Sequence, residues 1–151
     1  MKSKILIFIL LCTMSCQDKD QHKKLIGEFA ASLSNDNMPT REIISKYMKL
    51  NEMPLDKKKL VDSILSLQVN ALRDFAGSCQ KPYEIYTYEE ARHKNLSGFF
   101  EIQSDDLKNV YFLECKSDEL LPFKISEDHK IISFSTMSKG NMRYFLKYYE
   151  D

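Results

Sequence analysis

The aromatic residues of this chain are unevenly distributed, and their distribution constrains the fold more than any other feature. Of the 17 aromatic residues, made up of 8 Tyr and 9 Phe, 13 lie within residues 81–151. Aromatic side chains favour the half-buried surface of a β-sheet. The first half of the chain instead repeats aliphatic residues at spacings of three and four, as amphipathic helices do. The sequence therefore predicts helices first and a sheet afterwards.

Three helical patterns lie in the first half, within residues 22–34, from Thr40 onward, and between Pro54 and Gly77. Thr40 is predicted to cap the second helix, because a threonine hydroxyl can accept a hydrogen bond from a free N–H group of the first turn. Gly77 is predicted to end the third helix. We expect the long apolar stripe of this third helix to face the core: Leu60, Val61, Ile64, Leu67, Ala71, Leu72 and Phe75.

Short runs of alternating apolar and polar residues, separated by polar turns, predict strands in the second half. Pro122 is expected on a sheet edge or at the start of a strand, because proline has no N–H to donate to a neighbouring strand. The polar segment 89–94 is predicted to connect two strands, either as an irregular connector or as one helical turn. The predicted strands cover residues 83–88, 98–103, 109–115, 120–125, 130–137 and 142–149.

Together these elements predict one α+β domain over residues 22–151, with about three N-terminal helices followed by an antiparallel β-meander. The order of elements resembles that of the cystatin-like and NTF2-like group, in which a curved sheet wraps a long helix. The resemblance implies a cone-shaped sheet and, between sheet and helix, a cavity of the kind that NTF2-like folds often form.

Residues 1–16 have the layout of a secretory signal peptide. Two lysines precede an unbroken apolar run at residues 5–11, and small residues follow it. The run is far shorter than the roughly 20 residues that a membrane-spanning helix needs. The end of the segment resembles the lipobox of bacterial lipoproteins, because Ser15 and Cys16 match its small residue and its cysteine. That resemblance implies cleavage before Cys16 and attachment of acyl chains such as palmitate to this cysteine.

Residues 17–21 form a short charged tether after the lipobox-like cysteine. The tether resembles the acidic stretch that sends some Bacteroidota lipoproteins to the cell surface, and a plain solvated spacer is the alternative. Many small lipoproteins of Bacteroidota are similar to this chain in length and layout. We therefore expect a lipid-anchored protein of the bacterial cell envelope, in the outer membrane, on its periplasmic or its surface face.

The charge balance argues against a nucleic-acid partner. The chain has 22 basic and 22 acidic residues, and cleavage before Cys16 removes Lys2 and Lys4 but no acid. The cleaved protein is therefore slightly acidic, whereas binding to phosphates usually requires an excess of positive charge.

Two cysteines remain after cleavage, Cys79 and Cys115. An envelope location permits a disulfide, and only one pairing is available to them. The alternative is that both are separate, small buried residues. The sequence leaves these two alternatives open.

Candidate catalytic and metal-binding residues are few. Glu89 or Glu90 could share a helix face with His93, but a lone pair seldom makes a site, and a solvated connector explains the segment. Asp105 and Asp106 fit a polar turn between strands, because no further acids stand at the spacing of a calcium loop. Four scattered glycines provide no phosphate-binding loop. We therefore expect no cofactor, no metal site and no catalytic residue.

The leading hypothesis is a non-enzymatic lipoprotein, anchored to the membrane through Cys16, whose domain binds a protein partner. Interbacterial immunity proteins and accessory subunits of envelope complexes fit this description. The alternative is a small-molecule-binding domain of the NTF2-like kind. A third hypothesis is an enzyme that uses the cavity of such a fold, with Glu90 and His93 as its acid and its histidine.

The lipid anchor has a direct test. The substitution Cys16→Ala is expected to abolish incorporation of a fatty-acid analogue, because it removes the thiol that would carry the acyl chain. Metabolic labelling of wild type and variant, followed by gel analysis, measures this. Equal labelling of both proteins, or labelling of neither, would contradict the anchor.

Overall fold

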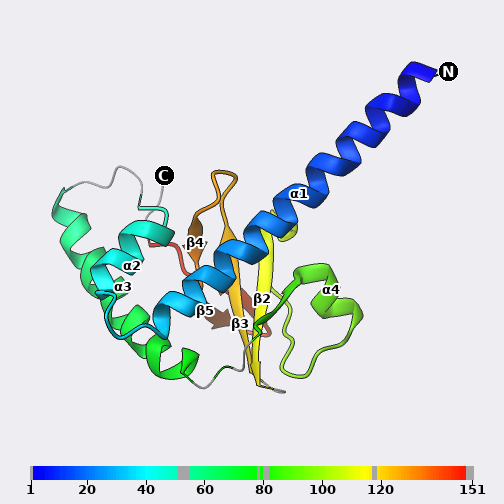
Figure 1. Ribbon diagram of the computed structural model, residues 1–151. Coiled ribbons are helices and arrows are strands. Elements are labelled where there is room, and N and C mark those ends of the chain that lie inside the picture. Colours follow the sequence, from blue (N-terminus) through cyan, green and yellow to red (C-terminus); the bar gives the residue numbers. More distant parts are fainter. Residues whose placement is uncertain (1, 51–54, 78, 80–81, 117–118, 149–151) are drawn as a thin grey trace.

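Helices precede the sheet in the structure, and the α+β class predicted from the sequence is confirmed (Figure 1). Helix α1 spans Lys2–Leu33, α2 spans Thr40–Tyr47, and α3 spans Leu55–Ala76. The computed structural model describes residues 2–50, 55–77, 79, 82–116 and 119–148, without the side chains of residues 2–17, 55, 56 and 116.

The main sheet is an antiparallel meander whose four strands pair in the order β1-β2-β3-β4. Its strands are β1 at Glu84–Thr87, β2 at Val110–Lys116, β3 at Glu119–Ile125 and β4 at Ile131–Ser133. The short helix α4, Tyr88–His93, and the 3₁₀ turn η1, Leu107–Asn109, lie between β1 and β2. A separate antiparallel hairpin follows, with β5 at Thr136–Lys139 and β6 at Met142–Phe145.

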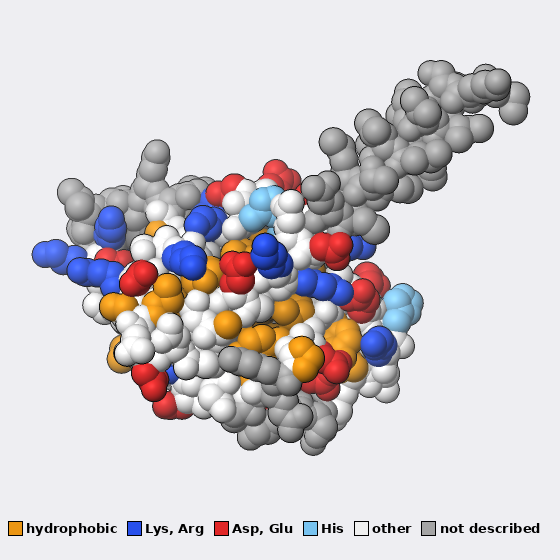
Figure 2. Space-filling view, in the orientation of Figure 1, with side chains coloured by type: hydrophobic (Ala, Val, Ile, Leu, Met, Phe, Trp, Pro, Cys, Tyr) orange, Lys and Arg blue, Asp and Glu red, His pale blue; other side chains and the backbone are white. Residues whose placement is uncertain are grey.

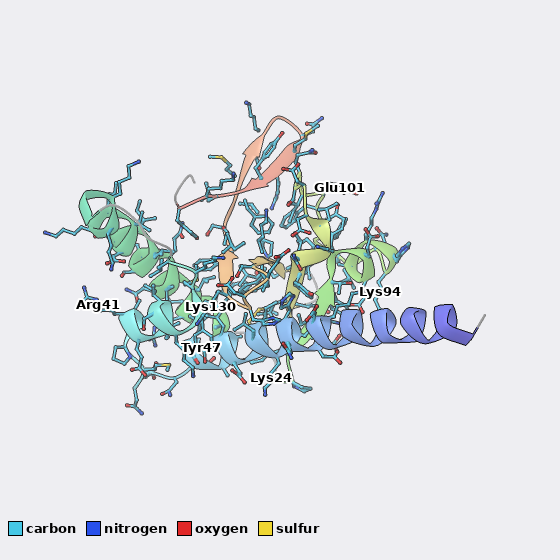
Figure 3. All side chains as sticks on the ribbon, turned by 90° about the horizontal axis from the view of Figure 1, so that it is seen from above. Lys24, Arg41, Tyr47, Lys94, Glu101 and Lys130 are labelled. Atoms are coloured by element: carbon cyan, nitrogen blue, oxygen red, sulfur yellow. A yellow bond between two sulfur atoms is a disulfide. The ribbon has the colours of Figure 1, made fainter. Side chains whose placement is uncertain are left out.

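Helix α1 packs across one face of the main sheet, and the β5–β6 hairpin lies on the opposite side of the sheet from α1 (Figure 3). The sequence spacing explains this packing, because Ile26, Phe29, Ala30 and Leu33 recur at helical intervals and all four are buried. Helices α2 and α3 lie together to one side of the sheet, and α4 lies to the other side (Figure 1). The core therefore forms where α1 meets the sheet and the α2–α3 pair.

The helix predicted for residues 22–34 is part of a much longer helix. The backbone of α1 is helical from Lys2, through the predicted signal segment and tether, to Leu33. The ribbon of its N-terminal half extends away from the rest of the chain (Figure 1). No helix in the described ranges combines the length and hydropathy needed to cross a membrane.

Three strand predictions are wrong in detail, and one of them, the strand predicted for residues 142–149, ends at Phe145. Residues 98–103 form no strand and contribute only an isolated bridge between Ile102 and Arg143. Phe99 and Phe100 instead direct their rings at Phe112 of β2, with centroid distances of 5.5 and 5.4 Å. Aromatic packing on the sheet face thus takes the place of hydrogen bonding at its edge.

The single strand predicted for residues 130–137 is divided into β4 and β5. Phe134 lies between the two strands and is 2% exposed, with its ring packed against Phe29 of α1. Burial of this ring accompanies the break, after which the chain leaves the main sheet to form the hairpin.

Of two predictions of local geometry, one is confirmed in part and the other is wrong. Pro122 lies inside β3, opposite Phe112 of β2, and not in an outer strand or at the start of a strand. The other side of β3 pairs with β4 only from Lys124 onward, so the sheet has a local free edge at Pro122. Thr40 does not cap α2, because Pro39 holds the cap position. The Thr40 hydroxyl instead hydrogen-bonds to Asn70 Oδ1 of α3 at 2.6 Å.

The buried face of α3 differs from the predicted stripe. Six described residues of α3 are buried or pack against the core, and three of them belong to the predicted stripe, Val61, Leu72 and Phe75; the other three are Leu65, Val69 and Ala76. Leu60 and Leu67 of the predicted stripe are instead 64% and 71% exposed. The buried set and the exposed set are turned from one another by about two-fifths of a helical turn. The long stripe in the sequence is therefore two adjacent apolar faces, and only one of them reaches the core.

Cys79 and Cys115 form a disulfide in the structure. Cys79 follows α3, and Cys115 is a buried residue of β2. The bond ties the C-terminal end of the helical half to the C-terminal end of β2, an inner strand of the main sheet. Gly77 ends α3 as predicted, and its N–H donates to Arg73 O at 3.0 Å.

Removal of this disulfide is expected to destabilise the fold. The double substitution Cys79→Ala and Cys115→Ala should lower the free energy of unfolding by about 3–4 kcal/mol, because the bond closes a loop across a sequence separation of 36 residues. Urea denaturation with and without a thiol reductant measures the change. The reductant should weaken wild type and leave the double variant unchanged; a wild type insensitive to reductant would contradict the prediction.

Candidate functional site

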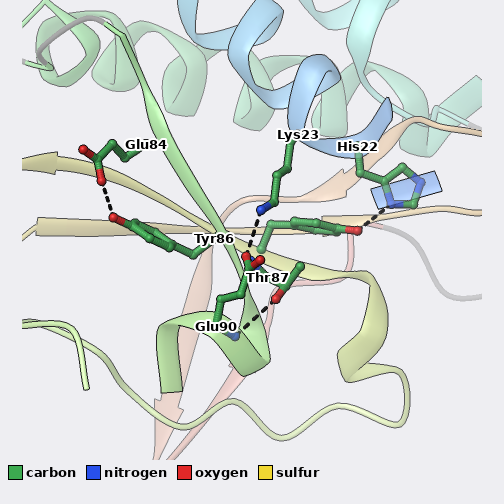
Figure 4. Close-up of polar contacts among 7 residues, drawn as sticks. His22, Lys23, Glu84, Tyr86, Thr87 and Glu90 are labelled. Atoms are coloured by element: carbon green, nitrogen blue, oxygen red, sulfur yellow. Dashed lines mark hydrogen bonds and ion pairs between the residues drawn. The ribbon is translucent and has the colours of Figure 1, made fainter. Parts of the chain in front are cut away.

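The acid and histidine residues proposed as catalytic partners lie on α4, where the structure gives Glu90 a structural role. The Glu90 carboxylate accepts a hydrogen bond from the Thr87 N–H at 2.7 Å, and the Glu90 N–H donates to Thr87 Oγ1 at 3.2 Å (Figure 4). This capping box begins α4. Lys23 of α1 binds the same carboxylate at 2.8 Å. Glu90 therefore fixes α4 to α1.

His93 is a surface residue whose side chain is 83% exposed. Its Nε2 lies 3.8 Å from Oε2 of Glu89. Neither His93 nor Glu90 lines any of the hollows described below. Asp106 accepts a hydrogen bond from Asn109 Nδ2 at 2.6 Å and so supports the turn at η1, whereas Asp105 is exposed. Glu90 and Asp106 therefore stabilise local structure, and these contacts do not support the hypothesis of an enzyme.

Cys16 lies within the helical backbone of α1, and its side chain is outside the described part of the chain. Its lipidation therefore stays a prediction. Across the described residues, no group of three or more His, Cys, Asp or Glu side chains is placed to hold a metal ion.

A buried histidine that the sequence analysis did not single out lies where α1 meets the sheet. His22 is 3% exposed, and its Nδ1 lies 3.0 Å from the Tyr111 hydroxyl (Figure 4). The ring of His129 packs edge-on at a centroid distance of 4.9 Å. The signal was present in the sequence, because His22 stands four and seven residues before Ile26 and Phe29 on the buried face of the helix.

The two histidines lie beside a hollow of about 390 Å³. Among the described residues, His22 Nε2 and His129 Nδ1 are buried and have no hydrogen-bond partner. The hollow is lined by Asp18, Lys19, His22, Lys108, Asn109, Tyr111, Glu127 and His129.

Burial sets the protonation states of His22 and Tyr111. It lowers the pKa of His22, and nearby His129 lowers that pKa further, against an opposing effect from Asp18. Burial also raises the pKa of Tyr111 to about 12, and the negative charge of Asp18 acts in the same direction. At neutral pH both the imidazole of His22 and the hydroxyl of Tyr111 are therefore uncharged.

A larger cleft of about 470 Å³ opens between the main sheet and the β5–β6 hairpin. Its volume is within the range of about 300–1,000 Å³ that is usual for ligand pockets. Lys124 Nζ donates to Ser104 Oγ at 3.3 Å in its wall. The lining includes three lysines, one acid and two tyrosines: Lys49, Lys124, Lys147, Asp105, Tyr144 and Tyr148. An excess of positive charge over an aromatic wall suits a small anionic molecule.

The third feature is the outer face of α3, which we define as Leu60, Ile64, Leu67 and Ala71. Its three large side chains are 64%, 40% and 71% exposed, respectively. In Figure 2, hydrophobic side chains and lysines lie next to one another on the α2–α3 side of the molecule. A groove of about 710 Å³ beside this face is lined from both helices, including Arg41, Lys58, Lys59 and Asp62.

Acid is expected to weaken the fold through His22. Because burial lowers its pKa in the folded state, the unfolded chain binds this proton first as the pH falls below about 6.5. Stability should therefore fall between about pH 7 and about pH 5. The substitution His22→Gln should reduce this pH-dependent fall in melting temperature.

The exposed His93 provides the matched control, since His93→Gln should leave the pH dependence at its wild-type value. Melting temperatures measured across the same pH range for all three proteins decide the matter. An equal loss of melting temperature in wild type and His22→Gln would show that His22 does not cause it.

Comparisons with known proteins give no relative from which a function could be inferred: no family model, no curated protein and no solved structure matches this chain. The geometry of the chain's own residues is therefore the basis for inferring its function.

Proposed function

We propose that this chain is a non-enzymatic lipoprotein of the bacterial envelope, anchored through Cys16, that binds another protein through the outer face of α3. One observation carries the binding surface: Leu60, Ile64 and Leu67 are exposed together on one side of a regular helix. The signal-peptide layout of residues 1–16 supports the anchor and the location.

Exposure of the outer face of α3 to water is unfavourable in free energy. Full burial of one leucine or isoleucine side chain is worth about 1.5–3 kcal/mol, and three such side chains line this one face. Single exposed apolar residues are common on protein surfaces, but a contiguous row of them is typical of an interaction site. A partner that covers Leu60 and Leu67 would recover part of this free energy.

The helical geometry of the face indicates the kind of partner. A straight apolar row along a helix of 22 residues fits a second helix laid lengthwise better than a compact ligand. Polar residues border the row, among them Lys59 and Ser63. Such a polar rim around an apolar centre is the usual anatomy of a protein interface.

The cleft between the main sheet and the hairpin supports a second candidate function, the binding of a small anionic molecule. Lys49, Lys124 and Lys147 line it, against the single acid Asp105. Two of these lysines already have partners, because Lys49 pairs with Asp128 at 2.9 Å and Lys124 donates to Ser104. The cleft is therefore a weaker candidate than the outer face of α3, whose leucines are exposed.

Photo-cross-linking in intact cells tests the binding surface. A photoreactive amino acid such as p-benzoylphenylalanine, placed at Leu60 or Leu67 of the full chain, is expected to yield a discrete product of higher mass. The same amino acid at Met137, which is 53% exposed on the hairpin, is the matched control and should yield none. Absence of any product from the α3 positions, or equal products from all three positions, would remove the proposal.

A further inference from the structure

The outer face of α3 has the residue spacing of a coiled-coil seam. Leu60, Ile64, Leu67 and Ala71 follow one another at intervals of four, three and four residues, and all four are exposed. Alternation of three and four residues keeps such side chains directed at one partner helix along its length. The face therefore has the geometry for lengthwise packing against another helix.

Opposite charges stand at the two ends of this seam. The same spacing continues three residues in each direction, to Lys57 at the N-terminal end and Asp74 at the C-terminal end, and both are exposed. The flanking positions Ser63 and Asn70 are neutral. The seam thus runs from a positive end, through an apolar middle, to a negative end.

We infer that a second copy of this chain occupies the outer face of α3, with the two α3 helices packed antiparallel. This inference rests on the proposed function, because it takes the same face as the binding surface and names the partner. Reversal of one helix about a point between residues 65 and 66 superimposes the seam on itself. The pairs that face one another between the two copies are then Leu60 with Ala71, Ile64 with Leu67, and Lys57 with Asp74.

The self-complementarity of the seam favours a second copy over an unrelated helix. A two-fold axis makes every contact occur twice, so one sequence must satisfy both sides of the interface. Here the largest exposed side chains face a smaller or equal apolar residue, and each cation faces an acid. Parallel packing would instead place Lys57 against Lys57 and Asp74 against Asp74, where like charges repel.

The pairing depends on the membrane for its strength. Three large apolar side chains per copy make a small interface beside standard complexes, which bury about 1,600 Å² in total. Two copies held in one membrane by the proposed lipid on Cys16 meet at a much higher effective concentration than in free solution. The dimer is therefore expected in the membrane, and the test uses the full chain in intact cells.

A charge swap in the full chain distinguishes self-pairing from other partners. Cross-linking from position 67 should give a product of twice the chain mass. Lys57→Glu alone, or Asp74→Lys alone, should reduce this product roughly fivefold or more, because either change places like charges opposite one another at both ends. The double variant Lys57→Glu with Asp74→Lys should restore it, since both ends regain opposite charges.

The outcomes separate this inference from the proposed function. A product of another mass, or a dimer product that the double variant does not restore, would overturn antiparallel self-pairing. A product of another mass would nevertheless leave the outer face of α3 as a protein-binding surface. Absence of any product from positions 60 and 67 would remove both. Melting temperatures equal to wild type, expected because both charged side chains are exposed, confirm that the variants are folded.

Discussion

The packing of Phe29 is the interaction on which the other elements of this fold depend. The centroid of its ring lies 5.7 Å from that of Tyr47 in α2, 5.8 Å from that of Phe123 in β3 and 5.9 Å from that of Phe134. One side chain of α1 thus contacts the helical pair, the sheet and the segment that leads to the hairpin. Helix α2 packs on the rings around Phe29, and α3 packs on α1 and α2. The position of the exposed face of α3 therefore depends on the packing of Phe29.

The sequence was sufficient to predict the class of the fold and the order of its elements, because both depend on local periodicity. It was insufficient where a long-range contact decided the outcome. Residues 98–103 are a largely apolar run of strand length, yet Phe99 and Phe100 pack on Phe112 from outside the sheet. Pro122 lies at a free edge, as predicted, but this edge arises because β4 pairs with β3 only from Lys124 onward, which local sequence does not show.

The same limit applies to the candidate sites. Periodicity shows that α3 is apolar over a wide arc, but it does not show which side of that arc lies against the core, as Leu65 and Val69 do, and which side is exposed. Leu60 and Leu67 became candidates for binding only when their exposure was known. His22 could have been identified from its register with Phe29, whereas its contact with His129 joins residues far apart in the chain. The lipid anchor depends on a local motif, so it was the functional prediction that the sequence alone could motivate.

The continuity of α1 determines how the domain would stand on a membrane. Between Cys16 and His22 the backbone is helical, and a helix rises by about 1.5 Å per residue. His22, the first buried residue among the described side chains of α1, would therefore lie about 9 Å from the acylated Cys16. The connection between them would be a stiff helix and not a flexible linker. A connection of this kind restricts how far the domain can swivel. Neighbouring copies would then present α3 at similar heights above the bilayer, so their encounter becomes a search in two dimensions.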